Sequence, residues 1–404
     1  MSPWMRHVLF LLPIAGLWVV VVSSHSHAWA QDFGLDYRIP AGFVYEEASL
    51  TPEKARELAK RHAVLTLLKV TALSPEVAEN LVTPYLDTFL TLTALETIDA
   101  ESAAKLSVRR GYLRLWGITS LTPEQAAALV GSPGQGLEVT GVREITPEVA
   151  HALVRGKRDA LRLGLTTLPA DIAEILAEFP GELWFPRLET LSREAAAALG
   201  KHRKAIDLGP ADISPEVAEI LLHHDAPIGL TSVKKLAPGV GDILARHKSE
   251  VRLALEEIDS VSLARKLFSE PHASTSVVNL RTMSPAIAAE YARRNPWYLE
   301  HLDSLSLEAA KELAKGKQDI DFPAIAKLSP ELATALTERT RAVYLRGLKS
   351  LDGPDAVAVA EALASTPAPV YMPFLERVSA PALAALRKKA TIKIPPDEKL
   401  TIVP

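Results

Sequence analysis

The sequence predicts an α/β fold: a solenoid of about fifteen strand–helix units, with a parallel sheet along its concave face. Three observations predict it. An apolar residue followed by a helix-capping residue recurs every 22 to 25 residues, with one gap of 27. Each recurrence opens a short amphipathic segment, and a short apolar triplet follows that segment. One helix and one strand per repeat place the parallel strands on one side and the helices on the other.

Each unit begins at an apolar anchor residue, and the units together form a solenoid over residues 50–396. Residues 31–49 precede the first unit, and we expect them to cap its exposed core. Residues 397–404 follow two prolines and read as a loosely attached C-terminal tail. The fifteen anchors are Leu50, Leu73, Ile98, Leu121, Ile145, Leu168, Leu191, Ile213, Leu236, Ile258, Met283, Leu305, Leu328, Leu351 and Val378.

A short helix is predicted directly after each anchor. The next residue is Ser, Thr or Asp in thirteen of the fifteen units, and such side chains accept hydrogen bonds from the free N–H groups at a helix start. Pro follows in eight units, at the helical position where a missing N–H costs nothing. Ala five residues after the anchor and Leu eight residues after it complete an apolar stripe at helical spacing.

A short strand is predicted after each helix, from an apolar–x–apolar triplet. Two units depart from the pattern. The unit that begins at Ile258 has Lys266 in place of the core Leu, with Leu267 one residue later. Residues 299–302 interrupt the strand triplet, so we expect an irregularity there between two blocks of repeats. Triplets are clearest at Leu113, Leu137, Leu161, Leu183, Ile206, Val251, Ile320 and Val343.

One unit, read from Leu113 to Val130, shows the complete pattern. It places apolar residues at Leu113, Leu115, Ile118, Leu121, Ala126 and Leu129, with Thr122 after the anchor. This pattern resembles the leucine-rich repeat, and in particular its cysteine-containing subtype. The resemblance implies a strand–helix solenoid. This chain differs at one position, because the family's Asn or Cys is replaced by Ile, Leu or Val. We therefore expect dry apolar packing there instead of an internal hydrogen-bond ladder.

The residues that vary between units lie on the predicted sheet face. Side chains alternate along a strand, so the middle residue of each triplet and the residue two places later face solvent. The predicted protein-binding residues on this face are Arg114, Trp116, Glu138, Arg162, Trp184, Asp207, Arg252, Arg281, Asp321, Tyr344, Arg346 and Tyr371, and Thr66, Thr91 and Asn279 occupy further positions of it.

Two groups on this face favour a protein or peptide ligand. Trp, Tyr and Arg are enriched where proteins bind one another. One group contains Arg114, Trp116, Arg162 and Trp184, and the other contains Tyr344, Arg346 and Tyr371. The alternative interpretation is that these side chains stack on one another along the sheet and bind nothing.

The first thirty residues predict a secretory signal peptide. Arg6 gives a positive start, residues 8–22 form an apolar run, and Ala28 and Ala30 provide the small residues of a cleavage site. The run of fifteen residues is short for a membrane span of about 20 residues, so we expect no stable membrane insertion after cleavage. The alternative is an uncleaved anchor. If the signal peptide is cleaved, we expect export to the periplasm, the cell envelope or the medium.

Composition narrows the function classes. The chain has no Cys, which excludes disulfides, thiolate metal sites and a catalytic thiol. A formal charge of −4 gives no electrostatic case for nucleic acid. No catalytic constellation is recognisable, so the sequence predicts no enzyme, no catalytic residue and no cofactor. The leading hypothesis is an exported binding or scaffold module, and the alternative is a passive, self-associating structural protein of the envelope.

Several weaker motifs have ordinary structural explanations. The glycines of residues 131–136 lack the Lys-Ser/Thr ending of a phosphate loop. His62, His202 and His247 follow helices, where positive charge suits the helix end, and we expect no metal site there. Asp319 and Asp321 share one strand face, but too few oxygen ligands lie nearby for Ca²⁺. The basic runs 201–204 and 387–389 are predicted to be solvated helix ends.

Overall fold

The computed structural model describes residues 42–82, 88–209, 213–269, 279–294 and 299–404. Fifteen helices lie within these ranges, one after each predicted anchor. They are α2 (Pro52–Arg61), α3 (Pro75–Asn80), α4 (Ala100–Ser107), α5 (Pro123–Val130), α6 (Pro147–Val154), α7 (Ala170–Leu176), α8 (Arg193–Leu199), α9 (Pro215–Leu221), α10 (Val240–Leu244), α11 (Val261–Leu267), α12 (Pro285–Arg294), α13 (Leu307–Ala314), α14 (Pro330–Thr337), α15 (Ala356–Ser365) and α16 (Ala380–Arg387).

Short strands precede or follow these helices. They are β1 (Phe43–Tyr45), β2 (Val64–Leu67), β3 (Phe89–Leu92), β4 (Tyr112–Leu115), β5 (Gly134–Val139), β6 (Arg158–Leu163), β7 (Glu182–Phe185), β8 (Ile206–Leu208), β9 (Ile228–Leu230), β10 (Val251–Leu253), β11 (Ile320–Asp321), β12 (Val343–Tyr344), β13 (Ser350–Leu351), β14 (Val370–Tyr371), β15 (Arg377–Ser379), β16 (Ile392–Lys393) and β17 (Thr401–Val403), with a 3₁₀ turn, η2, at Asp397–Lys399.

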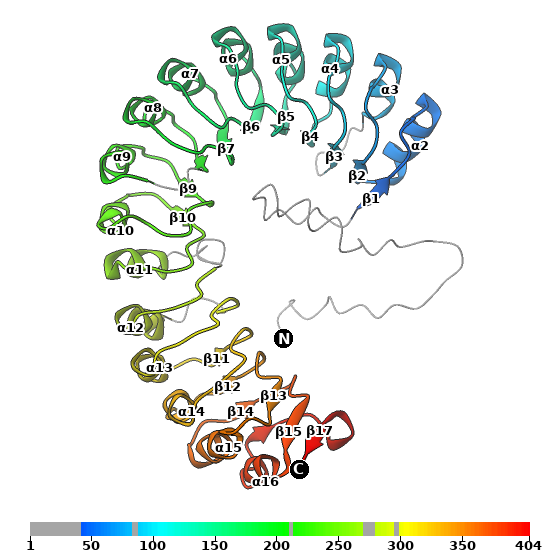
Figure 1. Ribbon diagram of the computed structural model, residues 1–404. Coiled ribbons are helices and arrows are strands. Elements are labelled where there is room, and N and C mark those ends of the chain that lie inside the picture. The colour runs from blue at the N-terminus through cyan, green and yellow to red at the C-terminus, as the bar shows by residue number, and fades with distance from the viewer. Residues whose placement is uncertain (1–41, 83–87, 210–212, 270–278, 295–298) are drawn as a thin grey trace. The chain divides into compact units, whose positions relative to one another are not determined.

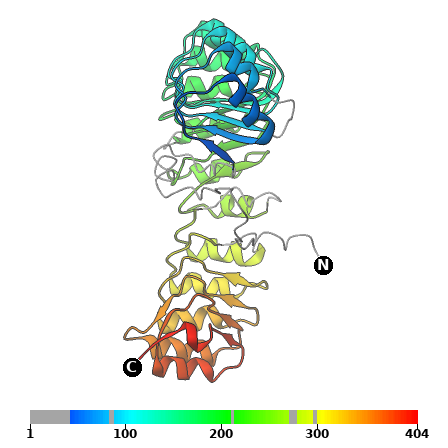
Figure 2. The same cartoon turned by 90° about the vertical axis from the view of Figure 1, so that its right-hand side faces the viewer.

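The strands pair in the order of the sequence and are all parallel. β1 to β10 form one ten-stranded sheet, β11, β12, β14 and β16 form a second, and β13, β15 and β17 form a third. In Figure 1 the strands β1–β10 lie on the inner side and their helices on the outer side. Figure 2 shows the successive helices stacked beside one another in a separate layer. The predicted α/β solenoid of strand–helix units is therefore confirmed.

The predicted helix starts are confirmed in most units. Ser214, for example, accepts a hydrogen bond from the Val217 amide at 3.3 Å, and Pro215 opens α9. Two predicted caps are wrong. Ser260, and not Asp259, caps α11, so this helix starts one residue late and Leu267 takes the core position that Lys266 would hold. Asp352 caps no helix, because its carboxylate pairs with Arg377 at 3.0 Å.

The core is one continuous apolar column between sheet and helices. The repeated Ala and Leu of the helices are fully buried, as Ala126 and Leu129 illustrate. Ile118, Val142 and Leu188, which replace the Asn or Cys of the leucine-rich repeat, are each at most 1% exposed. The predicted dry packing at this position is confirmed, since these side chains fill the turn where a polar ladder would otherwise lie.

The predicted irregularity between two blocks of repeats is also confirmed. Within the described residues between β10 and β11 no strand forms, so the ten-stranded sheet ends at β10 and a separate sheet starts at β11. Helices α11 to α14 nevertheless pack consecutively against one another through this region. The stacking of successive units is therefore continuous in the helix layer, although the sheet is interrupted there.

Residues 397–404 are not a loosely attached tail, and that prediction is wrong. β17 pairs in parallel with β15, with Val378 opposite Ile402. The Arg387 guanidinium also binds the Asp397 carboxylate. At the other end, residues 43–45 form β1 and pair with β2, while residues 31–41 of the predicted cap lie outside the described residues. The predicted signal peptide lies outside them too. None of the helices that the structure describes has the length and apolarity needed to cross a membrane.

A polar ladder that the sequence analysis missed runs along the C-terminal ends of the helices. The third residue after the buried helix Leu is cationic or an imidazole in seven units. In one of them Arg61 is exposed and pairs with Glu57, and most of the other six side chains bond to backbone carbonyls of the preceding repeat. Because those carbonyls have no partner within their own helix, the contacts satisfy them and join neighbouring units. The six residues are Arg109, His202, His224, His247, Arg339 and Lys389.

Individual contacts show how the ladder crosses between repeats. Arg109 Nη1 donates to the Leu81 carbonyl at 3.0 Å, and the His202 ring Nδ1 lies 3.0 Å from the Ala177 carbonyl. His247 Nε2 lies 2.8 Å from the His224 carbonyl. Lys389 Nζ donates to the carbonyls of Leu363, Thr366 and Ala368. The prediction that runs 201–204 and 387–389 are solvated is thus wrong for His202, which is 2% exposed, and for Lys389.

Gly164 permits a close approach between neighbouring turns. Here the apolar residue after the strand, Leu165, comes one place earlier than in most units, as Leu255 does after β10. A Cβ at Gly164 would lie 2.0 Å from the Thr140 carbonyl oxygen of the preceding repeat, a contact that backbone cannot relieve. Only a residue without a side chain lets the two turns approach this closely.

Replacing Gly164 with Ala is expected to lower the free energy of unfolding by about 2–3 kcal/mol, because the two turns must separate. Urea denaturation followed by circular dichroism measures the change. Gly353→Ala is the matched control: its added Cβ has no neighbour within 4 Å, so its effect should stay within about 0.5 kcal/mol. Equal effects of the two substitutions would contradict the steric explanation.

Candidate binding surface

The register of the ten-stranded sheet brings most of the predicted face residues into one row. The residues paired across successive strands are the middle residues of the predicted triplets. Their predicted position on one face of the sheet is therefore correct. Neighbouring strands lie about 4.8 Å apart, which puts each of these side chains in reach of the next. From β2 to β10 the row reads Thr66, Thr91, Arg114, Glu138, Arg162, Trp184, Asp207, Gly229 and Arg252.

Glu138 lies at the centre of the row, between two guanidinium groups. Arg114 Nε is 3.3 Å from Glu138 Oε2, and Arg162 Nε is 3.9 Å from Glu138 Oε1. The side chains of Arg114 and Glu138 are 6% and 8% exposed. Trp116 donates from its indole Nε1 to Glu138 Oε1 at 2.9 Å. One buried carboxylate therefore orients two arginines and a tryptophan.

Trp184 is held in a similar way on β7. The Arg162 guanidinium lies over its ring, with Cζ 4.9 Å from the ring centroid, which is a cation–π arrangement. The indole Nε1 of Trp184 donates to Glu182 Oε2 at 3.2 Å. Both indoles remain half-buried, so part of each ring is open to solvent. The predicted first group, Arg114, Trp116, Arg162 and Trp184, is therefore brought together on β4 to β7.

Two aromatic residues of this surface were missed by the sequence analysis. The rings of Phe89 and Tyr112 stack with centroids 5.1 Å apart, and the Arg114 Cζ lies 4.9 Å above the Phe89 ring. Both residues open their strands, two places before the triplet's middle residue, and strand alternation puts them on the same face. Alternation applied backward from the triplet, as well as forward, identifies both residues. We call Phe89, Tyr112, Arg114, Trp116, Glu138, Arg162 and Trp184 the central face.

The glycine-rich stretch of residues 131–136 belongs to this sheet. Gly134 and Gly136 lie in β5, which confirms that the stretch joins a helix to a strand. A Cβ at Gly136 would lie 2.6 Å from the Tyr112 ring, and one at Gly134 would lie 2.3 Å from Arg158 Nη1. The absent side chains thus make room for a ring on one side and for a buried guanidinium on the other.

Asp207 follows Trp184 in the row and is buried. Its Oδ1 accepts a hydrogen bond from the Thr231 hydroxyl at 2.9 Å. Burial raises the pKa of the Asp207 carboxyl, against the lowering effects of Thr231, Arg162 and Arg252. Arg252 pairs with Glu250, which directly precedes β10, Nε to Oε2 at 3.6 Å. Beyond Trp184 the row is therefore polar, and its charged side chains are engaged in contacts within the protein.

The second predicted group also comes together, on β11, β12, β14 and β16. The rings of Tyr344 and Tyr371 stack with centroids 4.6 Å apart. Arg346 pairs with Asp321, whose pKa burial raises and Arg346 lowers. In register, Asp321, Tyr344 and Tyr371 are followed by Lys393.

Arg281 lies in none of the strands that the structure describes, so its predicted place in the strand row is wrong, while its part in binding stays a prediction. It lies between β10 and β11, where the described residues form no strand, with its side chain 56% exposed, and it pairs with Asp303 at 3.1 Å and with Glu256 at 3.7 Å. Asn279 lies in the same interval, in a turn. Without a strand at Arg281, strand alternation does not direct its side chain into the row.

Metal ligation finds no support in the geometry of the described residues. Within them, no three His, Asp or Glu side chains are grouped so that they could hold a metal ion. Asp319 Oδ1 accepts from the Ala342 amide at 3.0 Å, and Asp321 binds Arg346. His202 and His247 contact backbone carbonyls in the helix-end ladder.

No family model matches the chain, and no curated protein matches it. Solved structures with a related arrangement include a chain of the Drosophila Toll–Spatzle complex, with 15% identity and a TM-score of 0.37, matched over 80% of this chain and 45% of that one. An internalin from Listeria monocytogenes matches at 11% identity and TM-score 0.34, over 85% and 88% of the two chains. An LRR protein of Leptospira interrogans matches at 14% identity and TM-score 0.33, over 91% and 98%.

The chain spans less than half the length of the Toll-complex chain it matches. With TM-scores below 0.5, these likenesses do not by themselves establish the class of this chain. The class is defined by the chain's own units: strands and helices alternate, the strands are parallel, and the apolar residues of the leucine-rich-repeat pattern are buried. The structure is a solenoid of leucine-rich-repeat-like units, as the sequence predicts.

Proposed function

We propose that the protein is an exported, non-enzymatic binding module that captures a protein or peptide on its central face. The observation that carries the proposal is the fixed geometry of two half-exposed indoles. Trp116 is tied to Glu138, and Trp184 is tied to Glu182 and covered by Arg162. Side chains that are ordered before binding lose little entropy when a ligand arrives, so their apolar area contributes more fully to affinity.

The composition of the central face also supports a protein ligand. Trp, Tyr and Arg are the residues most enriched at energetically dominant interface positions. The buried Arg114–Glu138–Arg162 group neutralises much of its own charge, so the face offers aromatic area within a polar surround and no strong net field. Export is part of the proposal on the strength of residues 1–30 alone.

Substitution of both indoles tests the proposal. The full chain is panned against a displayed random-peptide library, and the affinity of the enriched peptides is measured for wild type and for Trp116→Ser/Trp184→Ser. We expect affinity to fall at least tenfold, because each lost anchor is worth about 2 kcal/mol. Circular dichroism should show an unchanged fold, since neither indole is part of the apolar column.

The control is Val108→Ser, an exposed apolar residue outside the central face, which should leave these peptides bound. Equal binding by wild type and the double variant would exclude the central face as the ligand site. Light scattering addresses the self-associating alternative: assembly of the wild type that persists in the double variant would favour a structural role.

A further inference from the structure

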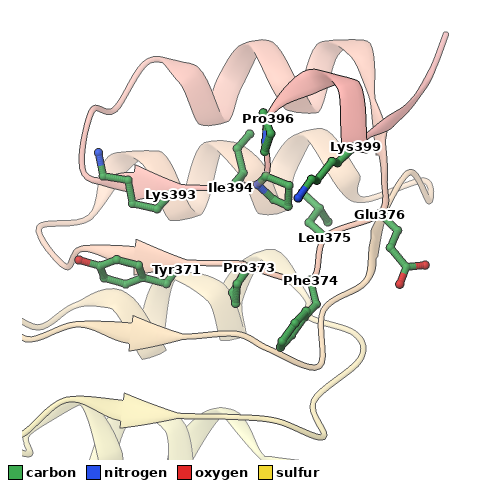
Figure 3. Close-up of a pocket in the computed structure, with 10 residues that line it drawn as sticks. Tyr371, Pro373, Phe374, Leu375, Glu376, Lys393, Ile394, Pro396 and Lys399 are labelled. Carbon is green, nitrogen blue, oxygen red and sulfur yellow. The ribbon is translucent and has the colours of Figure 1, made fainter. Parts of the chain in front are cut away.

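A pocket of about 510 Å³ lies between two neighbouring coils, away from the central face. One coil follows β14 and the other follows β16. Figure 3 shows the apolar side chains of both coils along the pocket, with Tyr371, Pro373 and Phe374 on the first and Ile394 and Pro396 on the second. These side chains give the pocket an aromatic and proline-rich floor.

The apolar floor is open to solvent and rigid. Phe374 is 54% exposed, although the next residue, Leu375, is 1% exposed and fastens the coil to the core. Pro373, Pro395 and Pro396 restrict the backbone and carry no N–H donor. Phe374 therefore belongs to a contiguous apolar surface with the neighbouring prolines and Ile394, and a contiguous exposed apolar surface is typical of sites that bind another molecule.

Two lysines lie at opposite ends of this floor. Lys393 continues the row of Tyr344 and Tyr371, and Lys399 belongs to η2. In Figure 3 they flank Ile394 and Pro396, and the Glu376 side chain extends away from them. Within the described chain neither lysine forms an ion pair, whereas the neighbouring Arg377 and Arg387 pair with acidic residues. The pocket thus presents unpaired positive charge at both ends.

We propose that this pocket binds a short, extended acidic segment of a partner protein. An apolar side chain of the segment packs on Phe374, and its flanking carboxylates approach Lys393 and Lys399. Tyr371 to Phe374 spans roughly 10 Å of extended chain, which suits a segment of about three or four residues. The inference concerns the second predicted group and does not depend on ligand binding at the central face.

The charge around the pocket favours a peptide over an anionic membrane. Glu376 lines the pocket and Glu398 is exposed beside Lys399, whereas Asp397 is paired with Arg387. A charged membrane surface would approach all of these groups at once, so its attraction to the lysines would be offset by repulsion from the acids. A narrow peptide can place its carboxylates at the two lysines alone.

The test is a displayed library of pentapeptides with Asp or Glu at both ends and apolar residues between, panned against the full chain. We expect enrichment of acidic peptides, and at least tenfold weaker binding by Lys393→Glu/Lys399→Glu and by Phe374→Ser, which remove the charge complement and the apolar contact respectively. The three side chains are exposed, so circular dichroism should show folded variants.

The controls distinguish this site from the central face. Trp116→Ser/Trp184→Ser should bind the acidic peptides as wild type does, and a matching library with Lys at both ends should give no enrichment. Failure to enrich acidic peptides, or enrichment that all the pocket variants retain, overturns the inference. Binding to phosphatidylserine vesicles through the same lysines, without peptide binding, also overturns it and identifies a membrane surface instead.

Discussion

Replacing Arg158 with Met is expected to lower the free energy of unfolding of the repeats around β6 by about 2–3 kcal/mol, because buried backbone carbonyls lose their donor. The guanidinium is 1% exposed and donates to the carbonyls of Ser107 at 2.9 Å and Arg109 at 3.1 Å, with longer contacts to Gly111 and Leu129. Methionine fills similar volume but leaves these carbonyls without a donor.

The effect should be local as well as large, because Arg158 reaches across an intervening unit. Its carbonyl partners at residues 107–111 lie two repeats earlier, and its side chain passes over Gly134 of β5. In a solenoid each unit otherwise contacts only its neighbours, so this side chain joins three units. Hydrogen exchange should therefore show faster amide exchange from β4 to β6 than elsewhere.

Arg155→Met is the matched control, since Arg155 is exposed at the end of α6 in the same unit. Its unfolding free energy should stay within about 0.5 kcal/mol of wild type. An Arg158→Met protein as stable as this control would show that water replaces the guanidinium at the carbonyls without cost.

The sequence predicted the features whose causes are local. A helix start depends on four or five consecutive residues, so the Ser214 cap and Pro215 identify α9 without knowledge of the rest of the chain. Strand alternation is equally local, and it placed Arg114, Glu138 and Arg162 in one row. Repetition strengthened both predictions, because the same pattern recurs in fifteen units.

The contacts that join units could not be predicted from the sequence. Arg158 and the carbonyl of Arg109 are 49 residues apart, and their meeting depends on the register of three strands. Arg281 lies where the described residues form no strand, and Lys389 binds carbonyls 21 to 26 residues earlier. Periodicity identifies the units of a solenoid but gives no information on the polar side chains that cross between them.

Acidification is expected to destabilise the helix-end ladder through His224. This imidazole is 1% exposed and stacks on His202, with ring centroids 6.3 Å apart. Burial, followed by the charges of His202 and His247, lowers the pKa of His224 from its ordinary 6.5 to about 4. Burial lowers the pKa of His202 as well. The folded protein thus holds both rings neutral under conditions where the unfolded chain would protonate them.

The direction of the effect follows from proton uptake. Below pH 6.5 the unfolded chain protonates His224, whereas the folded protein does so only near pH 4. The unfolded state therefore binds more protons in this interval, and stability falls as the pH falls from 6.5 to 4. The loss from His224 is at most roughly 3 kcal/mol, and about 2 kcal/mol with partial solvent screening allowed for. Above pH 6.5 His224 is neutral in both the folded and the unfolded state, so none of this stability is lost.

His224→Phe should remove most of this pH dependence. Another unit of the chain already has a phenylalanine at this position. Phe179 holds the equivalent position, three residues after Leu176, and is buried there. Urea denaturation between pH 4 and 7 should show a shallower loss of stability in the variant than in wild type. His223→Gln, at an exposed neighbouring position, should retain the wild-type profile. Parallel profiles for wild type and His224→Phe would show that the acid sensitivity has another source, because a phenyl ring cannot take up a proton.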